Sequence, residues 1–135
     1  MRRTALTRST PTQVAVFTAS LQIYAEKVLD VLDPEGVLFT HRLYRDSCVF
    51  YQDGLYLKDL SRVGRDLART AIVDNSPQVF GFQPDNGVPV LSWYGDRDDT
   101  ELLKLEPLLA AAALASDVRP LLHGYFGLAD RIAAA

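Results

Sequence analysis

Short apolar runs that end on polar side chains constrain the fold of this chain most strongly. Residues 14–17 read Val-Ala-Val-Phe and stop at Thr18, and residues 71–73 read Ala-Ile-Val and stop at Asp74. A short continuous apolar run is typical of a strand covered on both faces, as in a parallel sheet. A third such run covers residues 88–91. We therefore expect a mainly parallel sheet in which Thr18 and Asp74 follow the carboxyl ends of strands.

Helical patterns alternate with these strands. Apolar residues recur at helical spacing over residues 21–32, and Pro34 ends that pattern. A second helical stretch covers residues 98–115, where Pro107 should bend or split the helix, and a last turn or two should start near Asp117. Strands that alternate with helices predict an α/β domain.

Residues 48–51 and 55–57 are apolar runs on either side of Gln52-Asp53-Gly54. An Asp-Gly pair between such runs is typical of a β-hairpin, so we expect a small hairpin inserted into the domain. The expected core is a set of apolar residues on these strands and helices: Val16, Leu21, Val28, Leu32, Ile72, Val73, Val90 and Leu103.

The composition excludes some classes of protein. The formal net charge is −3, whereas a general nucleic-acid-binding domain would be strongly basic, so no nucleic-acid partner is expected. The single cysteine, Cys48, cannot form an internal disulfide and is expected to be a small buried apolar residue. No apolar run approaches the roughly 20 residues that cross a bilayer.

The two ends of the chain differ from its middle. Residues 1–13 contain three arginines and four threonines but no acid, which is similar to an organellar transit peptide. A disordered terminus, or the edge of an incomplete gene model, has the same composition. We therefore divide the chain into residues 1–13, a domain over residues 14–124, and a tail over residues 125–135 for which the sequence predicts no definite structure.

Three short pieces place polar groups where chemistry could occur. Thr18 offers a hydroxyl at a strand end, Lys58 follows the hairpin, and Asp74 with Asn75 ends another strand. Taken singly, these are most often a helix cap, a surface charge and a turn. Together they suit a phosphate with bound Mg²⁺, because the hydroxyl and ammonium groups bind phosphoryl oxygens and Mg²⁺ prefers hard oxygen ligands.

Longer stretches of sequence extend this pattern: FTASLQIYAEKVLDVLD, HRLYRDSCVF, YLKDLSRVGRDL, IVDNSP, QPDNGVPVLSW and DDTELL. As a set they make residues 14–122 resemble the haloacid-dehalogenase-type small C-terminal-domain phosphatases, including their Dullard-like branch. The resemblance implies a Rossmann-like, mainly parallel sheet with a hairpin insertion. It also implies a Mg²⁺-dependent protein serine/threonine phosphatase that works through an aspartyl-phosphate intermediate.

The same resemblance implies roles for individual residues. Thr18 matches the second motif of the family and Lys58 the third, and both would be catalytic. Asp74 and Asn75 match the fourth motif, in which the asparagine is a magnesium ligand and the aspartate helps to hold the metal site.

Two further positions bear on the substrate. Tyr24 and Arg45 match positions that contact the phosphopeptide in the branch that acts on the polymerase tail. Tyr24 could equally face the core from its helix, and Arg45 could be a plain surface arginine. The implied partner is a protein that carries phosphoserine or phosphothreonine; the sequence does not indicate the oligomeric state.

The first motif of the family, Asp-x-Asp-x-Thr or Val, has no match before Thr18. No aspartate or glutamate precedes Thr18, and the first carboxylate of the chain is Glu26, inside the first predicted helix. The first aspartate of that motif is the nucleophile, and the motif follows the central strand of the sheet. The resemblance therefore predicts a partial domain that lacks its first central strand and its nucleophile, and that is inactive alone.

A non-enzymatic alternative remains at this point. The chain could be a pseudophosphatase, or a relative of the import-receptor subunit of the mitochondrial inner-membrane translocase, which shares this domain. The intact Asp-Asn-Ser-Pro of residues 74–77 favours the phosphatase branch, because the import-receptor branch degrades this motif. The phosphatase reading implies the nucleus, nuclear envelope or cytoplasm, and the alternative implies the mitochondrion.

Overall fold

A computed structural model describes residues 12–134 of the chain. The expectation of a transit-like start concerns residues that lie almost entirely outside this range. The described residues form two compact units that join between Lys58 and Asp59. We call residues 12–58 the N-terminal unit and residues 59–134 the C-terminal unit, and describe each by itself.

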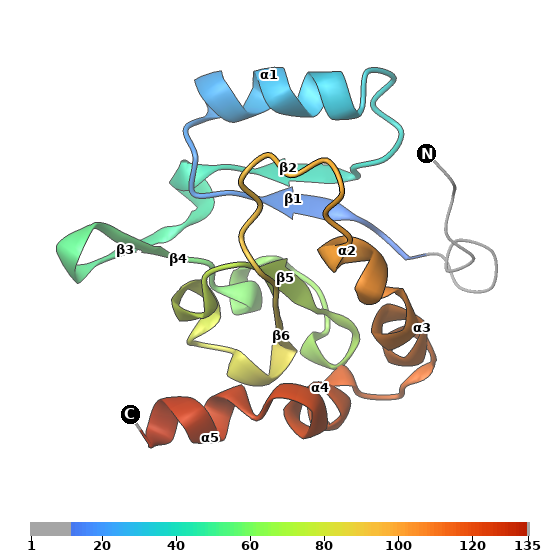
Figure 1. The fold of residues 1–135 in the computed structure, drawn as a ribbon. Helices are drawn as coiled ribbons and strands as arrows, with labels where there is room; N and C mark the ends of the chain where they lie inside the picture. Colours follow the sequence, from blue (N-terminus) through green and yellow to red (C-terminus); the bar gives the residue numbers. More distant parts are fainter. Residues whose placement is uncertain (1–11, 135) are drawn as a thin grey trace. The chain divides into compact units, whose positions relative to one another are not determined.

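The N-terminal unit contains a parallel strand pair joined by a helix (Figure 1). Strand β1 (Ala15–Phe17) pairs with β2 (His41–Leu43), and Ala15 lies opposite His41. Helix α1 (Gln22–Leu32) connects the two strands. The predicted first strand and first helix are therefore confirmed.

The apolar run at residues 37–39 does not form a strand, because its backbone is held by a side chain. Asp33 is buried, and its carboxylate accepts hydrogen bonds from the backbone N–H groups of Val37, Leu38 and Phe39 at 2.9, 3.1 and 3.1 Å. These bonds lower the pKa of Asp33, although burial opposes them. The strand that pairs with β1 consequently begins later, at His41.

The predicted hairpin is confirmed. Strand β3 (Val49–Tyr51) runs antiparallel to β4 (Leu55–Leu57), with Val49 opposite Leu57. The connecting residues Gln52–Gly54 include Asp53 at φ 62° and Gly54 at φ 76°. Two consecutive left-handed residues explain the Asp-Gly pair, since aspartate tolerates this region and glycine adopts it without steric cost.

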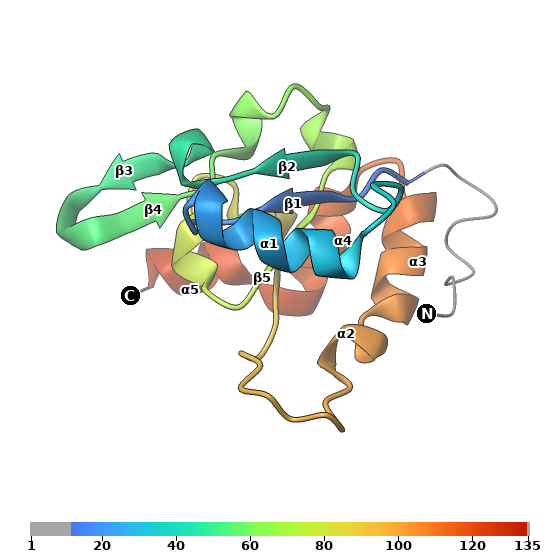
Figure 2. The same ribbon diagram turned by 90° about the horizontal axis from the view of Figure 1, so that it is seen from above.

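The C-terminal unit combines a second parallel strand pair with four α-helices (Figure 2). Strand β5 (Ile72–Asp74) pairs in parallel with β6 (Gly87–Pro89), and both strands lie at or next to runs that the sequence predicted to be strands. The helices are α2 (Glu101–Lys104), α3 (Glu106–Leu114), α4 (Val118–Phe126) and α5 (Leu128–Ala133).

Details of these helices follow from local sequence. Pro107 lies in the first turn of α3, so the predicted helix is split at Leu105 rather than continuous. Asp117 caps α4, because its carboxylate accepts a hydrogen bond from the N–H of Arg119 at 2.9 Å. Residues 125–133, for which the sequence predicted no definite structure, form the end of α4 and all of α5.

The core of the C-terminal unit lies between β6 and the helices. Its buried members are Val88, Leu108, Val118 and Leu122. Phe80 is also fully buried, and its ring lies against Gly87 so closely that a Cβ on that glycine would collide with it. This packing ties β6 to the short 3-10 helix at Pro77–Phe80.

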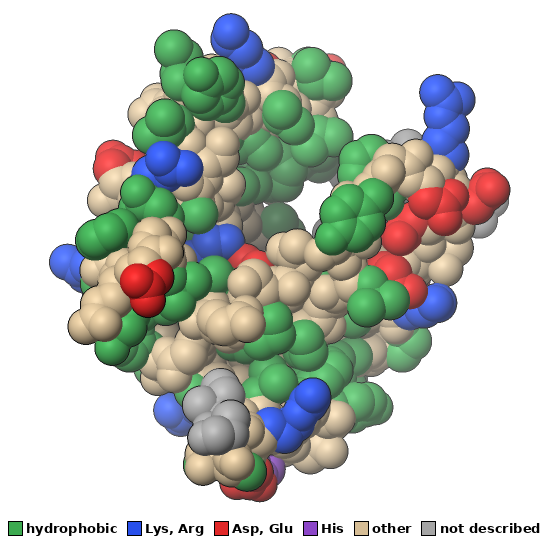
Figure 3. Space-filling view, turned by 60° about the vertical axis from the view of Figure 1, so that its left-hand side comes forward, with side chains coloured by type: hydrophobic (Ala, Val, Ile, Leu, Met, Phe, Trp, Pro, Cys, Tyr) green, Lys and Arg blue, Asp and Glu red, His purple; other side chains and the backbone are tan. Residues whose placement is uncertain are grey.

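Most of the predicted core residues are not buried. Ile72 is 8% exposed and confirms the prediction, and Val16 and Val90 are half-buried. The prediction is wrong for five residues, which are exposed: Leu21, Val28, Leu32, Val73 and Leu103. Apolar side chains cover much of the visible face in Figure 3. One reason for the exposure of apolar side chains is that, among the described residues, β1 and β5 each have a strand partner on one side only.

The chain is thus a mixed α/β protein with small parallel sheets, in agreement with the predicted class. The described strands form three two-stranded pairs rather than one continuous sheet. The absence of a first central strand from this chain remains a prediction. Within residues 12–134, none of the helices has the length and apolar character that a membrane span requires.

Candidate functional site

Thr18 lies in a fixed turn directly after β1. Its backbone N–H donates to the carbonyl oxygen of Leu43 at 2.9 Å, which continues the strand pairing by one residue. Its side-chain oxygen Oγ1 accepts a hydrogen bond from the N–H of Ser20 at 3.0 Å. A hydroxyl that accepts one bond still carries a proton to donate, so Thr18 can bind an anionic oxygen beyond the strand end.

Lys58 approaches the same strand end within the N-terminal unit. It follows β4 directly and is 7% exposed. Its ammonium nitrogen lies 6.0 Å from the ring centroid of Phe17, the last residue of β1 and the neighbour of Thr18. Lys58 therefore lies near Phe17 within the N-terminal unit, and its action together with Thr18 remains a prediction.

Arg45 is anchored at this strand end rather than loose on the surface. Its Nε donates to the carbonyl oxygen of Ala19 at 2.7 Å, and its backbone N–H donates to the carbonyl oxygen of Ser20 at 3.1 Å. Its guanidinium lies over the ring of Tyr56, 4.7 Å from the centroid. These side-chain contacts use Nε and the face of the guanidinium, so the Nη groups are available to donate to a substrate.

Tyr24 is 67% exposed on α1, so it does not face the core. An exposed ring is compatible with a contact to a peptide substrate. That role remains a prediction.

The C-terminal unit carries the other two predicted site residues. Asp74 is the last residue of β5, and its Oδ1 accepts a hydrogen bond from the N–H of Ser76 at 2.9 Å. The exposed side chain of Asn75 donates from Nδ2 to Ser92 Oγ at 2.8 Å. This bond orients the amide and directs its carbonyl oxygen, the atom that binds hard cations, away from Ser92.

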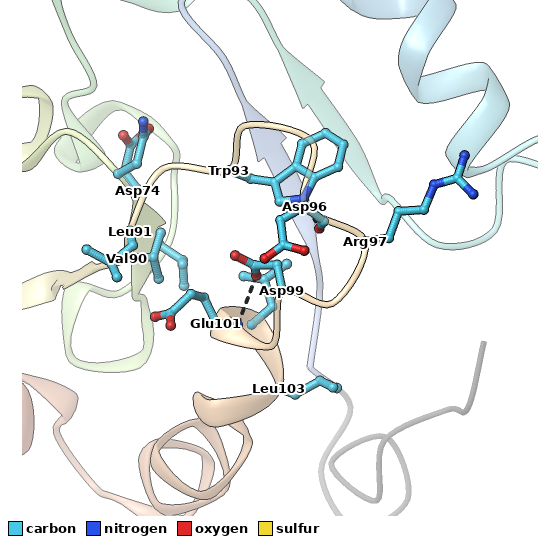
Figure 4. Close-up of a pocket in the computed structure, with 12 residues that line it drawn as sticks. Asp74, Val90, Leu91, Trp93, Asp96, Arg97, Asp99, Glu101 and Leu103 are labelled. Carbon is cyan, nitrogen blue, oxygen red and sulfur yellow. Dashed lines mark hydrogen bonds between the residues drawn. The ribbon is translucent and has the colours of Figure 1, made fainter.

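Asp74 and Asn75 line an open cavity of about 570 Å³ in the C-terminal unit (Figure 4). Apolar side chains of β5, the segment after β6 and α2 form much of its wall, among them Val73, Val90, Leu91, Trp93, Leu102 and Leu103. Carboxylates of the segment before α2 contribute the polar part. Thr18 and Lys58 belong to the other unit, so the expected sharing of one sheet edge by Thr18 and Asp74 stays a prediction.

Sequence reasoning overlooked one motif on this wall. Residues 96–100 read Asp-Arg-Asp-Asp-Thr, which matches Asp-x-Asp-x-Thr letter for letter. A search for the motif along the whole chain, rather than only before Thr18, would have found it. The structure places it on the turn that leads into α2, not after a strand.

Two of the carboxylates of this turn accept local hydrogen bonds through one oxygen each. Asp96 Oδ1 accepts from the N–H of Asp98 at 2.9 Å, and Asp99 Oδ1 accepts from the N–H of Glu101 at 3.0 Å. Trp93 Nε1 donates to the carbonyl oxygen of Asp96 at 2.7 Å. Such bonds are typical of a loop that starts a helix, so the motif has a structural explanation here.

The donor set fits part of a magnesium site. Asp74 supplies a carboxylate and Asn75 an amide oxygen, and Mg²⁺ is commonly held by one or two such ligands together with waters and substrate phosphate. Over residues 12–134 there is no group of three or more histidine, cysteine, aspartate or glutamate side chains that could enclose a metal. Asp74 and Asn75 could therefore hold Mg²⁺ only together with waters, phosphate or ligands from elsewhere.

Comparison with known proteins shows the family of this chain. The family described as NLI interacting factor-like phosphatase matches residues 6–119. CTD small phosphatase-like protein 2 of Dictyostelium discoideum is 52% identical over 123 residues, which are 91% of this chain and 21% of that protein. CTD small phosphatase-like protein 3 of Caenorhabditis elegans is 47% identical over 132 residues, 96% of this chain and 46% of that protein.

A human relative is similar to a shorter part of the chain. Carboxy-terminal domain RNA polymerase II polypeptide A small phosphatase 2 of Homo sapiens is 55% identical over 106 residues, 78% of this chain and 38% of that protein. The chain thus spans less than half the length of each of these three relatives. With a family match over residues 6–119 and identities near one half, the chain belongs to the NLI interacting factor-like phosphatase family.

Proposed function

We propose that this domain takes part in the Mg²⁺-dependent removal of phosphate from phosphoserine and phosphothreonine in proteins. The observation that carries the proposal is the buried Lys58 ammonium, which lies 6.0 Å from the ring centroid of Phe17, the residue before Thr18. A hydroxyl donor and a fixed cation at one strand end suit a phosphoryl group. The names of the relatives, which describe small phosphatases, support the same function.

Each side chain has a distinct task in this proposal. Thr18 donates a hydrogen bond to a phosphoryl oxygen and fixes its orientation. Lys58 neutralises the negative charge that develops on the transferring group. Asp74 and Asn75 hold the magnesium ion, which when bound supplies further charge neutralisation at the phosphate.

The nucleophile, in this proposal, comes from outside these 135 residues. Covalent phosphoryl transfer requires a carboxylate in line with phosphorus. Glu26 lies within α1, and the carboxylates of Asp96 and Asp99 accept hydrogen bonds from their own turn. An Asp-x-Asp-x-Thr segment that pairs as a strand with β1 or β5, each of which has one strand partner within residues 12–134, would supply both the nucleophile and a general acid and base.

Arg45 and Tyr24 are proposed to contact the phosphopeptide. Arg45 is held by Ala19 and Tyr56, so its Nη groups have a defined direction without the entropy that a loose arginine loses on binding. Tyr24 offers an exposed ring on the helix that follows Thr18.

The test compares the 135-residue chain with the same chain carrying an added Asp-x-Asp-x-Thr strand at its N-terminus. Phosphate release from a phosphoserine peptide is measured at equal protein concentrations, with and without Mg²⁺. We expect activity only in the extended chain with Mg²⁺. Within it, Lys58→Ala should lower turnover, and Asn75→Ala should raise the Mg²⁺ concentration required.

Gln22→Ala is the matched control, because Gln22 is an exposed residue of α1 whose side chain makes a long hydrogen bond of 3.4 Å to Glu26. Binding of the phosphopeptide by an extended chain that shows no turnover would instead support the non-enzymatic alternative. Activity of the extended chain that is unchanged by Lys58→Ala would contradict the role given to Lys58.

A further inference from the structure

One histidine of the C-terminal unit lies between two carboxylates that come from different elements. His123 is part of α4, and its Nδ1 lies 3.0 Å from Oδ1 of Asp85, in the short 3-10 helix at Pro84–Asn86. Its Nε2 lies 3.3 Å from Oδ2 of Asp130, on α5. Each ring nitrogen of His123 therefore faces an acidic oxygen.

The protonation state of His123 follows from this geometry. An ionised carboxylate only accepts hydrogen bonds, so each ring nitrogen that faces one must carry a hydrogen. A neutral imidazole has one N–H, and only the protonated ring has two. Asp85, and then Asp130, accordingly raise the pKa of His123 above its ordinary value of 6.5, although desolvation opposes them. The arrangement in the structure is the one that suits the protonated ring.

Other charges near α4 have partners of their own. α4 also packs against α3, β6 and the short helix that follows Asp66. Asp66 acts on Arg119, one turn before His123, and the guanidinium of Arg119 pairs with the aspartate that caps α4. Among the described residues, the charges that act on the pKa of His123 are those of Asp85 and Asp130. His123 also lies in the last turn of α4, where the helix dipole favours a positive charge.

Loss of the proton weakens the contact with α5 first. The neutral ring keeps one N–H, and Asp85 is both the closer and the less exposed of the two acceptors. The side chain of Asp85 is 36% exposed, whereas that of Asp130 is 81% exposed. The N–H is therefore retained toward Asp85. Nε2 then presents a lone pair to the carboxylate of Asp130, which is repulsive.

α5 depends on contacts of this kind because it is short. It has six residues, and isolated helices shorter than about 12 residues are marginal in water. Gly127, at φ 55°, separates it from α4, so that α4 does not continue into it. Leu128 is buried at the start of α5, and α5 contacts the segment Pro84–Asn86. The pair between Asp130 and His123 is a further attachment, and this attachment depends on pH.

We propose that protonated His123 holds α5 against the segment Pro84–Asn86, and that loss of its proton releases the helix. Because the pKa of His123 is raised in the folded state, the stabilisation of bound α5 is complete below the unfolded pKa. It is lost as the pH rises through the higher pKa of the folded state. Release of α5 uncovers Leu128. This switch does not depend on the phosphatase function proposed above.

The test is an NMR titration of the 135-residue chain from about pH 6 to about pH 9. The ring resonances of His123 and His41, the two histidines of the chain, report when each loses its proton. The Cα chemical shifts of residues 128–134 report the helix content of α5, and those of residues 118–122 in α4 are the internal reference. We expect α5 to lose helix content at the midpoint of His123. The ratio of bound to released helix should fall about two- to fivefold, the range for a partly exposed ion pair.

Two variants separate this contact from a general effect of pH. Asp130→Asn removes the charge on α5 and keeps the size of the side chain, so α5 should no longer change when His123 titrates. The pKa of His123 should also be lower in this variant than in the unchanged chain. His41→Gln is the matched control, because His41 is exposed and belongs to the N-terminal unit. It should leave the transition of α5 unchanged.

A constant helix content of α5 while His123 titrates would overturn the proposal. A transition of equal size in Asp130→Asn, or one that follows the midpoint of His41, would do the same. A parallel loss of helix content in α4 would show that the whole unit loosens, which also contradicts a switch specific to α5. If Asp130→Asn does not fold, His123→Gln provides the same comparison, because its side chain stays neutral at every pH and should abolish the transition.

Discussion

Asn86→Ala should be among the most destabilising single substitutions in the C-terminal unit. Asn86 is 2% exposed, and its amide is the hydrogen-bond donor to the carbonyl oxygens of Leu67 and Thr70. These carbonyls belong to the segment that leads into β5. Shortening the side chain to a methyl group removes both N–H donors of Nδ2 and leaves a small cavity beside the carbonyl oxygens of Leu67 and Thr70.

The magnitude follows from the two lost bonds. A net hydrogen bond contributes roughly 0.5–1.5 kcal/mol, and a buried carbonyl left without a donor costs about 1–3 kcal/mol. Because water can enter part of the space left by the amide, we expect a loss of about 2–4 kcal/mol rather than the sum of the upper limits. For a domain of this size, such a loss lowers the melting temperature by roughly 5–15 °C.

The assay is equilibrium unfolding in urea, followed by circular dichroism and tryptophan fluorescence. Asn75→Ala is the matched control, because Asn75 is the same residue type but exposed, with one bond to Ser92. It should change the unfolding free energy by less than about 0.5 kcal/mol. If Asn86→Ala costs no more than Asn75→Ala, the inference that Asn86 holds the entry to β5 is wrong.

Three further predictions concern the same unit. Gly87→Ala should cost about 1–3 kcal/mol because its Cβ collides with the ring of Phe80, and an unchanged thermal melt would contradict that packing. Ile72→Ala should cost about 2–5 kcal/mol in the same urea assay, and a loss near zero would contradict its burial. A hydrogen bond to Asp85 at 3.0 Å raises the pKa of His123 above 6.5. Protonated His123 therefore stabilises the folded chain fully below about pH 6.5, and this contribution fades as the pH rises through the higher pKa of the folded state. His123→Ala should therefore destabilise the chain more at acidic than at alkaline pH, and a pH-independent difference would refute the pairing.

Sequence patterns predicted the elements well where a local signal sets them. The run at residues 14–17, the Asp53-Gly54 turn, Pro107 and Asp117 each act on the backbone within a few residues, and each appears in the structure as expected. The strand at His41–Leu43 has no such signal, because its sequence is mixed and its start depends on the carboxylate of Asp33.

Burial was harder to predict than secondary structure, because it depends on what covers each element. Val28 and Leu32 have the helical spacing of a core face, yet they are exposed on α1. Gln83 and Asn86 are polar residues near a turn, so no pattern distinguishes them from loop residues. Their importance becomes visible only when the structure shows which distant backbone groups they bind.

The candidate site was predictable in part. The sequence predicted Thr18 and Lys58 to follow strands, and in the structure Thr18 follows β1, Lys58 follows β4, and the Lys58 ammonium lies 6.0 Å from the ring centroid of Phe17. The anchoring of Arg45 by Ala19 and Tyr56 could not be predicted, since it depends on how the hairpin lies against β1. Residues 96–100 are the opposite case. Their sequence matches Asp-x-Asp-x-Thr, but they lie in the turn before α2 and not after a strand.

The most direct test of the account is phosphate release from a phosphoserine peptide by the 135-residue chain alone, with saturating Mg²⁺. In our proposal this chain supplies groups that bind phosphate and Mg²⁺ but no nucleophile. Phosphate monoesters are among the slowest compounds to hydrolyse without catalysis. We therefore predict no release above the buffer control, and no difference between the unchanged chain and Asp96→Asn. Robust release from the unchanged chain that is abolished by Asp96→Asn would contradict the account and place the nucleophile in the turn before α2.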